Sequence, residues 1–225
     1  MSLLSQWVSL PPSLIELRRT RSLNPQQTTG RVWALEIPQG HINQPFASGI
    51  SRLDKKATHP VEKLPDQLQD HLRLVFVGTA ASQRSADLGH YYAHPGNRFW
   101  RTLHEVGITP RRYEPHEFPG LLELGIGFTD MCKAGAGMDH EALNFPIDAP
   151  AFREKMGRYR PKTIAFTSKK AASLFYGRPT KAVALGRQPP QEDFPIVFVL
   201  ASPSGAASGH WSVLPWQELA DSISS

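Results

Sequence analysis

RLVFVG, residues 73–78, is the stretch that decides the fold class. Its run of consecutive apolar residues, closed by Gly78, is typical of a strand that is buried on both faces of a parallel sheet. Three further strand candidates follow along the chain, at residues 125–130 (GIGFTD), 162–168 (KTIAFTS) and 195–202 (PIVFVLAS). The sequence therefore predicts four strands of one mostly parallel sheet.

Helical patterns separate these strands. In residues 97–107 (NRFWRTLHEVG), apolar side chains recur at helical spacing and the pattern stops at a glycine. Further helices are expected at residues 149–159 (APAFREKMGRY), 169–177 (KKAASLFYG) and 215–223 (PWQELADSI). Strands that alternate with helices predict a three-layer α/β/α sandwich with a central, mostly parallel four-stranded sheet. Ligands of such sheets bind beyond the carboxyl ends of the strands, so the segments that follow the strands are the candidate functional regions.

Residues 1–70 differ from the rest of the chain, with scattered prolines and basic residues. Apolar and polar residues alternate at 31–37 (RVWALEI), which predicts one half-buried strand. We expect an N-terminal extension that packs on the core and ends in a short helix near residues 65–72. A partly disordered tail is the alternative. The α/β domain itself would span residues 71–225.

The composition of the 225-residue chain narrows the class of protein. A hydrophobic content of 40% is typical of a globular protein, and the absence of any run of about 18 apolar residues argues against a membrane partner. Cys132 is the only cysteine, which excludes an intrachain disulfide and a four-thiolate metal or iron–sulfur site. We expect a cytoplasmic monomer. The net charge of +5 slightly favours a polyanionic partner.

The first segment that follows a strand, residues 78–82 (GTAAS), consists of small residues. Small side chains let backbone amides approach a ligand closely. A tight strand-to-loop turn explains the same composition. The segment is not a phosphate-binding P-loop, because no Gly-Lys-Ser/Thr follows at the required spacing.

The second segment, residues 91–100 (YYAHPGNRFW), gathers aromatic and polar side chains in a loop before a helix. A tyrosine ring can stack on a planar heterocycle, and the side chain of Asn97 can both donate and accept hydrogen bonds. Two structural explanations are alternatives to this binding role. Asn97 is placed to cap the following helix, and either Tyr91 or Tyr92 could be a core aromatic residue.

The third segment, residues 202–211 (SPSGAASGHW), follows the last strand. It is either an ordinary turn or a thin loop whose small side chains allow it to press on a phosphodiester chain and enter a duplex. It is not the nucleophile elbow of an α/β hydrolase, because the Gly-x-Ser-x-Gly arrangement is missing.

These three segments, in this order, resemble the uracil-DNA glycosylase superfamily, most closely the branch of the mismatch-specific uracil/thymine-DNA and hypoxanthine-DNA glycosylases. The resemblance covers residues 73–223 and is most specific at 91–100 and at 202–208 (SPSGAAS). It implies a hydrolase that extrudes a damaged nucleotide from DNA and removes its base. It further implies DNA with uracil or other deaminated bases as substrate, abasic-site DNA and free uracil as products, and neither metal nor cofactor.

The resemblance also implies roles for individual residues. The backbone amides of Thr79 and Ala80 would stabilise negative charge on the departing base, and Tyr92 would form an aromatic platform beneath it. Phe128 and Ser202 complete the expected base-binding set.

The chain departs from the family pattern at two of these positions. Most members carry an Asp or Asn at the position of Ala80 to position the attacking water, and many begin the later motif with His or Asn where this chain has Ser202. Asn97 and Asp130 are therefore the candidate catalytic residues: Asn97 for positioning water or base, Asp130 for recognising the base, with the two roles open to exchange. Asp130 could instead cap a helix or turn.

Contacts with the DNA backbone are expected from the loop and from one helix start. The candidates are Lys169, Ser204, Gly205, Ala206, Ala207 and Ser208. No lysine stands out as an amine nucleophile, so the predicted enzyme is monofunctional. The rival hypothesis is a non-catalytic binder of damaged or abasic DNA on a degenerate glycosylase fold, and Ala80 and Ser202 are its best support.

Overall fold

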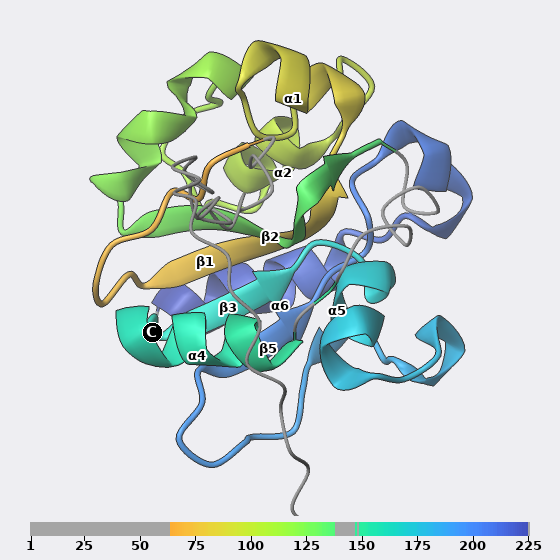
Figure 1. The fold of residues 1–225 in the computed structure, drawn as a ribbon. Coiled ribbons are helices and arrows are strands. Elements are labelled where there is room, and N and C mark those ends of the chain that lie inside the picture. Colours follow the sequence, from red (N-terminus) through yellow and green to blue (C-terminus); the bar gives the residue numbers. More distant parts are fainter. Residues whose placement is uncertain (1–63, 138–146, 148, 225) are drawn as a thin grey trace, which may run out of the picture. The chain divides into compact units, whose positions relative to one another are not determined.

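The computed structural model describes residues 64–137, 147 and 149–224, and every structural statement below concerns these residues (Figure 1). The predicted strand at 31–37 and nearly all of the predicted extension lie outside them. The described residues form a five-stranded sheet in the order β2-β1-β3-β5-β4. The strands are β1 (Leu74–Ala81), β2 (Ile126–Ala136), β3 (Thr163–Phe166), β4 (Gly186–Arg187) and β5 (Ile196–Val199).

All four predicted strands are present as β1, β2, β3 and β5, and they pair in parallel. The predicted number of strands was wrong, because β4 adds a fifth strand at the edge of the sheet. This strand is two residues long and runs antiparallel to β5, with Gly186 opposite Val199 and Arg187 opposite Phe198. A pair of residues carries no hydrophobic alternation, so no pattern in the sequence marks it.

Helices lie on both faces of the sheet, as predicted, because the strands are buried on both sides. On one face, Phe76 of β1 packs with Phe99 of α2 (Phe99–Glu105) and Trp216 of α6 (Leu214–Ser224). On the other face, Phe166 of β3 packs with Phe152 of α4 (Ala149–Tyr159) and Phe175 of α5 (Lys169–Tyr176). The helices are α1 (Gln83–Leu88), α2 (Phe99–Glu105), α4 (Ala149–Tyr159), α5 (Lys169–Tyr176), α6 (Leu214–Ser224) and the 3-10 segments η1 (Pro115–Leu122), η2 (Thr180–Ala182) and η3 (Gly205–His210).

The short helix expected near residues 65–72 does not form. This segment is extended at Gln67, whose backbone exchanges hydrogen bonds of 2.9 Å with the backbone of Phe128 on β2. The side-chain amide of Gln67 also donates to the carbonyls of Phe118 and Pro119, at 2.9 and 3.0 Å. Pairing with the exposed edge of β2 satisfies the backbone of this segment without a helix.

Strand β1 continues past Gly78, where the sequence predicted its end, to Ala81. Its pairing with β3 stops at Val77 opposite Phe166, whereas its pairing with β2 continues to Ala81. Residues 78–81 therefore have a neighbouring strand on one side only. The open side is the place where a ligand can reach the backbone of β1.

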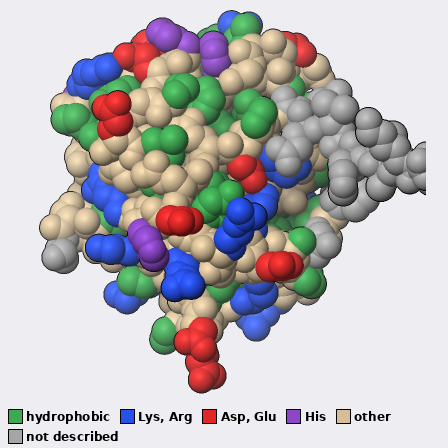
Figure 2. All heavy atoms as spheres, turned by 60° about the vertical axis from the view of Figure 1, so that its left-hand side comes forward, with side chains coloured by type: hydrophobic (Ala, Val, Ile, Leu, Met, Phe, Trp, Pro, Cys, Tyr) green, Lys and Arg blue, Asp and Glu red, His purple; other side chains and the backbone are tan. Residues whose placement is uncertain are grey.

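Acidic and basic side chains are interspersed on the face drawn in Figure 2, so the net charge is not gathered there as a single-sign patch. No helix in the described part of the chain is both long and apolar enough to cross a bilayer.

Candidate active site

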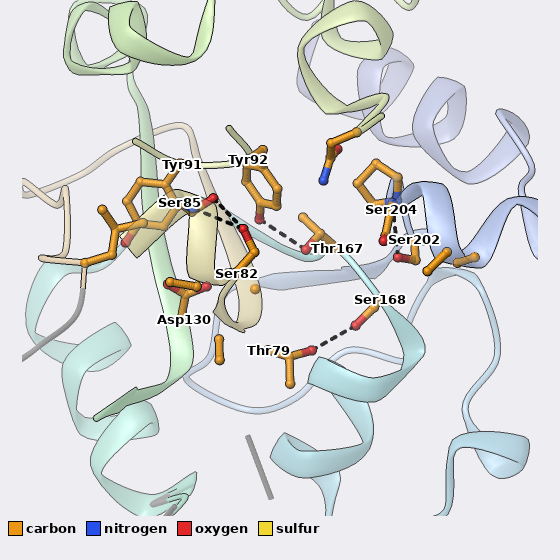
Figure 3. Close-up of a pocket in the computed structure, with 18 of the residues that line it drawn as sticks. Thr79, Ser82, Ser85, Tyr91, Tyr92, Asp130, Thr167, Ser168, Ser202 and Ser204 are labelled. Atoms are coloured by element: carbon orange, nitrogen blue, oxygen red, sulfur yellow. Dashed lines mark hydrogen bonds between the residues drawn. The ribbon is translucent and has the colours of Figure 1, made fainter. Parts of the chain in front are cut away.

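A pocket of about 350 Å³ lies at the carboxyl ends of the parallel strands (Figure 3). Its walls come from six separate parts of the chain: Leu64 before β1, the end of β1 with the start of α1, the loop before α2, β2 with the residue that follows it, the end of β3, and the loop after β5. Nearly all of the predicted base-binding and catalytic residues and part of the predicted DNA-binding loop line it, namely Thr79, Ala80, Tyr92, Asn97, Asp130, Ser202, Ser204, Ala206 and Ala207.

Asp130 lies deep in this pocket, and only 5% of its surface is exposed. It is the register partner of Gly78 across the β1–β2 pair. A Cβ atom on Gly78 would stand 2.1 Å from Oδ1 of Asp130 and 3.6 Å from the phenol oxygen of Tyr92. The carboxylate therefore leans over the backbone of β1, and only glycine at position 78 leaves it this space.

Burial raises the pKa of Asp130 to about 6, against an opposing effect of the Lys133 charge and a reinforcing effect of Asp66. Lys133 lies closer to Asp66 than to Asp130: its Nζ is 2.9 Å from Asp66 Oδ1 and 3.8 Å from Asp130 Oδ2. Asp66 also binds Lys155, with 2.5 Å between Oδ2 and Nζ. Both lysines thus contact Asp66 closely, and Asp130 is left with one long ion pair.

The backbone of Tyr92 is in the left-handed region, with φ of +53°. Its ring stacks on Phe99, with 3.9 Å between centroids and 14° between planes, and its hydroxyl is 3.1 Å from the hydroxyl of Thr167. Burial, followed by the nearby charge of Asp130, raises the pKa of the Tyr92 phenol. Tyr92 is therefore a neutral, fixed wall of the pocket.

Tyr91 and Phe128 belong to the core. Tyr91 is 2% exposed, stacks on Phe128 at 5.1 Å between centroids, and donates its hydroxyl to the Pro65 carbonyl at 3.1 Å. Phe128 is fully buried and does not line the pocket, in contrast to the contact with the base that the sequence predicted. It lies on the same side of β2 as Asp130 but about 6–7 Å deeper along the strand, where Tyr91 covers it.

Asn97 combines the two roles that the sequence left open. Its Oδ1 accepts a hydrogen bond from the backbone N–H of Phe99 at 2.9 Å, which stabilises the start of α2. The residue also lines the pocket, and its side-chain nitrogen has no hydrogen-bond partner among the described residues. The acceptor end of the amide is thus occupied by the helix, while the donor end is available to a ligand.

The loop after β5 is held directly against the loop before α2. The backbone N–H of Arg98 donates to the carbonyl of Pro203 at 2.8 Å. A Cβ atom on Gly205 would stand 3.1 Å from the carbonyl oxygen of Gly96, so a larger residue would push the two loops apart. The second and third segments of the sequence therefore form one continuous rim of the pocket.

Three predicted DNA-binding residues stand outside the pocket. Gly205 and Ser208 belong to η3, and the exposed hydroxyl of Ser208 donates to the Gly205 carbonyl at 2.8 Å. Lys169 is the first residue of α5 and directly follows Ser168, which does line the pocket.

The comparison with known families decides the assignment. The family model described as "Uracil DNA glycosylase superfamily" matches residues 65–220. The chain belongs to this superfamily. A solution NMR structure named "putative Uracil DNA glycosylase from Methanosarcina acetivorans" is also similar, with 19% sequence identity, a TM-score of 0.48, and coverage of 72% of this chain and 97% of that one. The predicted resemblance is confirmed at the level of the superfamily, while the branch stays a prediction.

The wall of this pocket at β1 carries two alanines. Ala80 and Ala81 both line it, so this part of β1 offers methyl groups, and Ala80 leaves the pocket without the water-positioning Asp or Asn that the resemblance associates with this position. Other strands contribute polar groups to the pocket. They include Asp130 from β2 and the Thr167–Ser168 pair after β3.

Sequence reasoning missed Thr167 and Ser168. Thr167 holds the Tyr92 hydroxyl, and the hydroxyl of Ser168 lies 3.3 Å from that of Thr79 and accepts from Ala171 N–H at 3.0 Å. Their position at the carboxyl end of a predicted strand was the available signal, because the carboxyl ends of parallel strands meet at the same edge of the sheet.

The same reasoning missed Asp66 and Lys133, and here the sequence carries no signal, since their contact joins segments far apart in the chain. Among the described residues, no cluster of three or more His, Cys, Asp or Glu is arranged to hold a metal ion.

Proposed function

We propose that this superfamily member is a monofunctional DNA glycosylase that extrudes and hydrolytically excises uracil, and other deaminated bases, from DNA. It would leave an abasic site and so initiate base-excision repair. The observation that carries the proposal is that Asn97, Asp130 and Tyr92 line one pocket at the strand ends. The similarity of residues 91–100 to the mismatch-specific and hypoxanthine-DNA glycosylases supports placing the chain in that branch.

The proposed chemistry uses the charge that develops as the base leaves. The bond between C1′ of the sugar and the base nitrogen breaks with its electron pair moving to the base, and a water oxygen bonds to C1′. The water proton is taken up by the Asp130 carboxylate or by the departing base. A donor such as the free amide nitrogen of Asn97, aimed at a base oxygen, stabilises the negative charge of the leaving base.

Asp130 suits the part of acceptor in this scheme. With a pKa of about 6 it is mostly ionised at neutral pH and can accept a base N–H or orient the water, with the exchange of roles between Asp130 and Asn97 still open. No lysine among the described residues lines the pocket, which supports attack by water over attack by an amine.

The rim formed by the loop after β5 is proposed to contact the DNA. Its small side chains at Ala206 and Ala207 line the mouth, with Ser204, Gly205 and Ser208 around them. Ser202 lines the pocket at the foot of this loop. Lys169 at the start of α5 would meet a phosphate beside the pocket, where the helix N-terminus adds a favourable partial charge.

A non-catalytic binder is the second candidate, favoured by the methyl group of Ala80 on the pocket wall. An assay of base release distinguishes the glycosylase from the non-catalytic binder. The purified full chain, in excess over labelled oligonucleotides that contain uracil, mismatched thymine, hypoxanthine or xanthine, should release free base and leave alkali-labile sites without prior strand cleavage. Binding without any released base would favour the binder.

Two isosteric variants test the site within the same assay. Asn97→Asp and Asp130→Asn keep the size of each side chain and change only its hydrogen-bonding and charge. Both should reduce base release while the chain still folds. Full activity in both would show that the site assignment is wrong even with the superfamily correct.

A further inference from the structure

A second, smaller hollow of about 280 Å³ adjoins the pocket and shares Asn97 with it. Arginines dominate its lining, and no acidic residue contributes to it. The lining residues are Pro95, Gly96, Asn97, Arg98, Arg101 and Arg112. Three guanidinium groups around one hollow are a strong electrostatic attraction for an anion.

The carboxylates near two of these arginines compete only weakly for them. Arg101 pairs with Glu105 at 3.3 Å, and Arg112 approaches Glu114 at 4.0 Å, with the distance measured from Nε in each case. All four side chains are more than half exposed to solvent, where such pairs contribute little. The outer nitrogens of both guanidinium groups therefore stay available to a ligand.

Arg98 has no polar partner for its side chain among the described residues. One of its nitrogens, Nη1, is buried without a hydrogen bond. The guanidinium lies 5.6 Å from the ring centre of Trp211, and the backbone N–H of Arg98 is fixed to Pro203 at 2.8 Å. Buried polar groups are seldom left unpaired, so a positioned guanidinium without a partner points to a ligand that is absent from the free chain.

We propose that Arg98, Arg101 and Arg112 form a binding site for a phosphate of the DNA strand that carries the extruded nucleotide. This inference rests on the proposed function for its ligand. The hollow borders the pocket at Asn97, and Arg98 lies against the loop after β5, so a strand that delivers its base to the pocket passes beside this hollow. A guanidinium group can donate two parallel hydrogen bonds to a phosphodiester, and such a contact does not depend on the base.

The test measures how binding depends on salt, with undamaged and uracil-containing labelled oligonucleotides as probes. An arginine that neutralises a phosphate of duplex DNA contributes about 0.9 to the slope of log K against log salt concentration. The double variant Arg101→Gln/Arg112→Gln should therefore lower the magnitude of the slope by about 1, the contribution of one phosphate, on both probes. Because both side chains are exposed, these changes should leave folding intact.

Two further variants separate a local site from a general effect of charge. Arg178→Gln removes an exposed positive charge just beyond the C-terminal end of α5, the opposite end of this helix from the pocket residue Ser168, and should leave the slope unchanged. Arg98→Lys keeps the charge but not the planar fork, and should weaken binding without changing the slope as much as Arg98→Gln does.

The possible results separate failure of this inference from failure of the proposed function. If the double variant and Arg178→Gln change the slope equally, or if neither changes it, the phosphate site is refuted even when the wild-type chain still excises uracil. If the double variant alone changes the slope, the site stands even when no base is released.

Discussion

Replacing Asp130 by asparagine removes a buried charge while keeping the size and shape of the side chain. Burial raises the pKa of this carboxyl group from 3.8 to about 6. Below pH 3.8 the folded and the unfolded chain both hold the proton. Between pH 3.8 and about pH 6 the unfolded chain has released it and the folded chain has not.

The sign and the size of the effect follow from this difference. Since the folded state binds more protons in that window, the free energy of unfolding falls as the pH rises through it. Each pKa unit is worth about 1.4 kcal/mol, so ionised Asp130 destabilises the fold by about 3 kcal/mol once the pH exceeds 6. Asparagine never ionises. The variant should therefore match the wild type near pH 4 and exceed its stability by about 3 kcal/mol at pH 8.

Urea denaturation at several pH values between 4 and 8, followed by the fluorescence of buried Trp100 and Trp216, measures this difference. The carboxylates other than Asp66, which interacts with Asp130, titrate alike in both proteins, so their contribution cancels in the comparison. A difference in stability that stays constant with pH would refute the reasoning. So would a variant that is less stable than the wild type at pH 8, since Lys133 would then stabilise the charge by more than burial costs.

Asp66 offers a matched control within the same group of charges. Burial alone would raise its pKa, but the charge of Lys133, together with Lys155 and Thr129, outweighs burial and lowers it. A lowered pKa contributes stability that is present above pH 3.8 and is lost as the pH falls through the folded value. Asp66→Asn should therefore destabilise the protein at pH 8 and do so less at low pH, the reverse of Asp130→Asn.

Three further predictions concern the pocket. In single-turnover assays, base release by the wild type should rise with pH through about 6, because ionised Asp130 is the proposed active form. This rise should be absent in Asp130→Asn. A pH profile that is the same in both proteins would contradict the proposed role of Asp130. Asn97→Asp keeps the acceptor for Phe99 N–H and should fold with wild-type stability while losing roughly 10²–10³-fold in rate, whereas Asn97→Ala should also lose about 1 kcal/mol of stability in urea denaturation. Gly78→Ala places a Cβ atom 2.1 Å from Asp130 Oδ1 and should abolish base release and destabilise the fold by about 1–3 kcal/mol, measured by activity and by urea midpoint.

The fold was predictable wherever a pattern repeats over enough residues. Apolar runs marked β1, β2, β3 and β5, and helical spacing marked α2. The convergence of the strand-end segments followed from topology, because parallel strands present their carboxyl ends at one edge.

What escaped prediction depends on contacts between distant parts of the chain. The segment around Gln67 is extended because the edge of β2 offers it hydrogen bonds, which its own sequence does not reveal. Phe128 was expected to touch the base, yet its depth along β2 places it under Tyr91. Lys133 contacts Asp66, which comes from a distant segment, and only the fold brings that carboxylate within 4 Å of its amine.

The register of β1 and β2 explains how the proposed enzyme could do without a polar group at Ala80. Gly78 lies opposite Asp130, and the lack of a side chain at Gly78 lets the carboxylate from β2 extend over β1. The carboxylate of Asp130 thus lies over β1 at the position of Gly78. This position is two residues before Ala80, about 6–7 Å along the strand. Because this carboxylate is buried and weakly paired, we expect it to lower the stability of the fold at neutral pH, and such a raised pKa in a ligand-sized pocket supports the proposed role of Asp130.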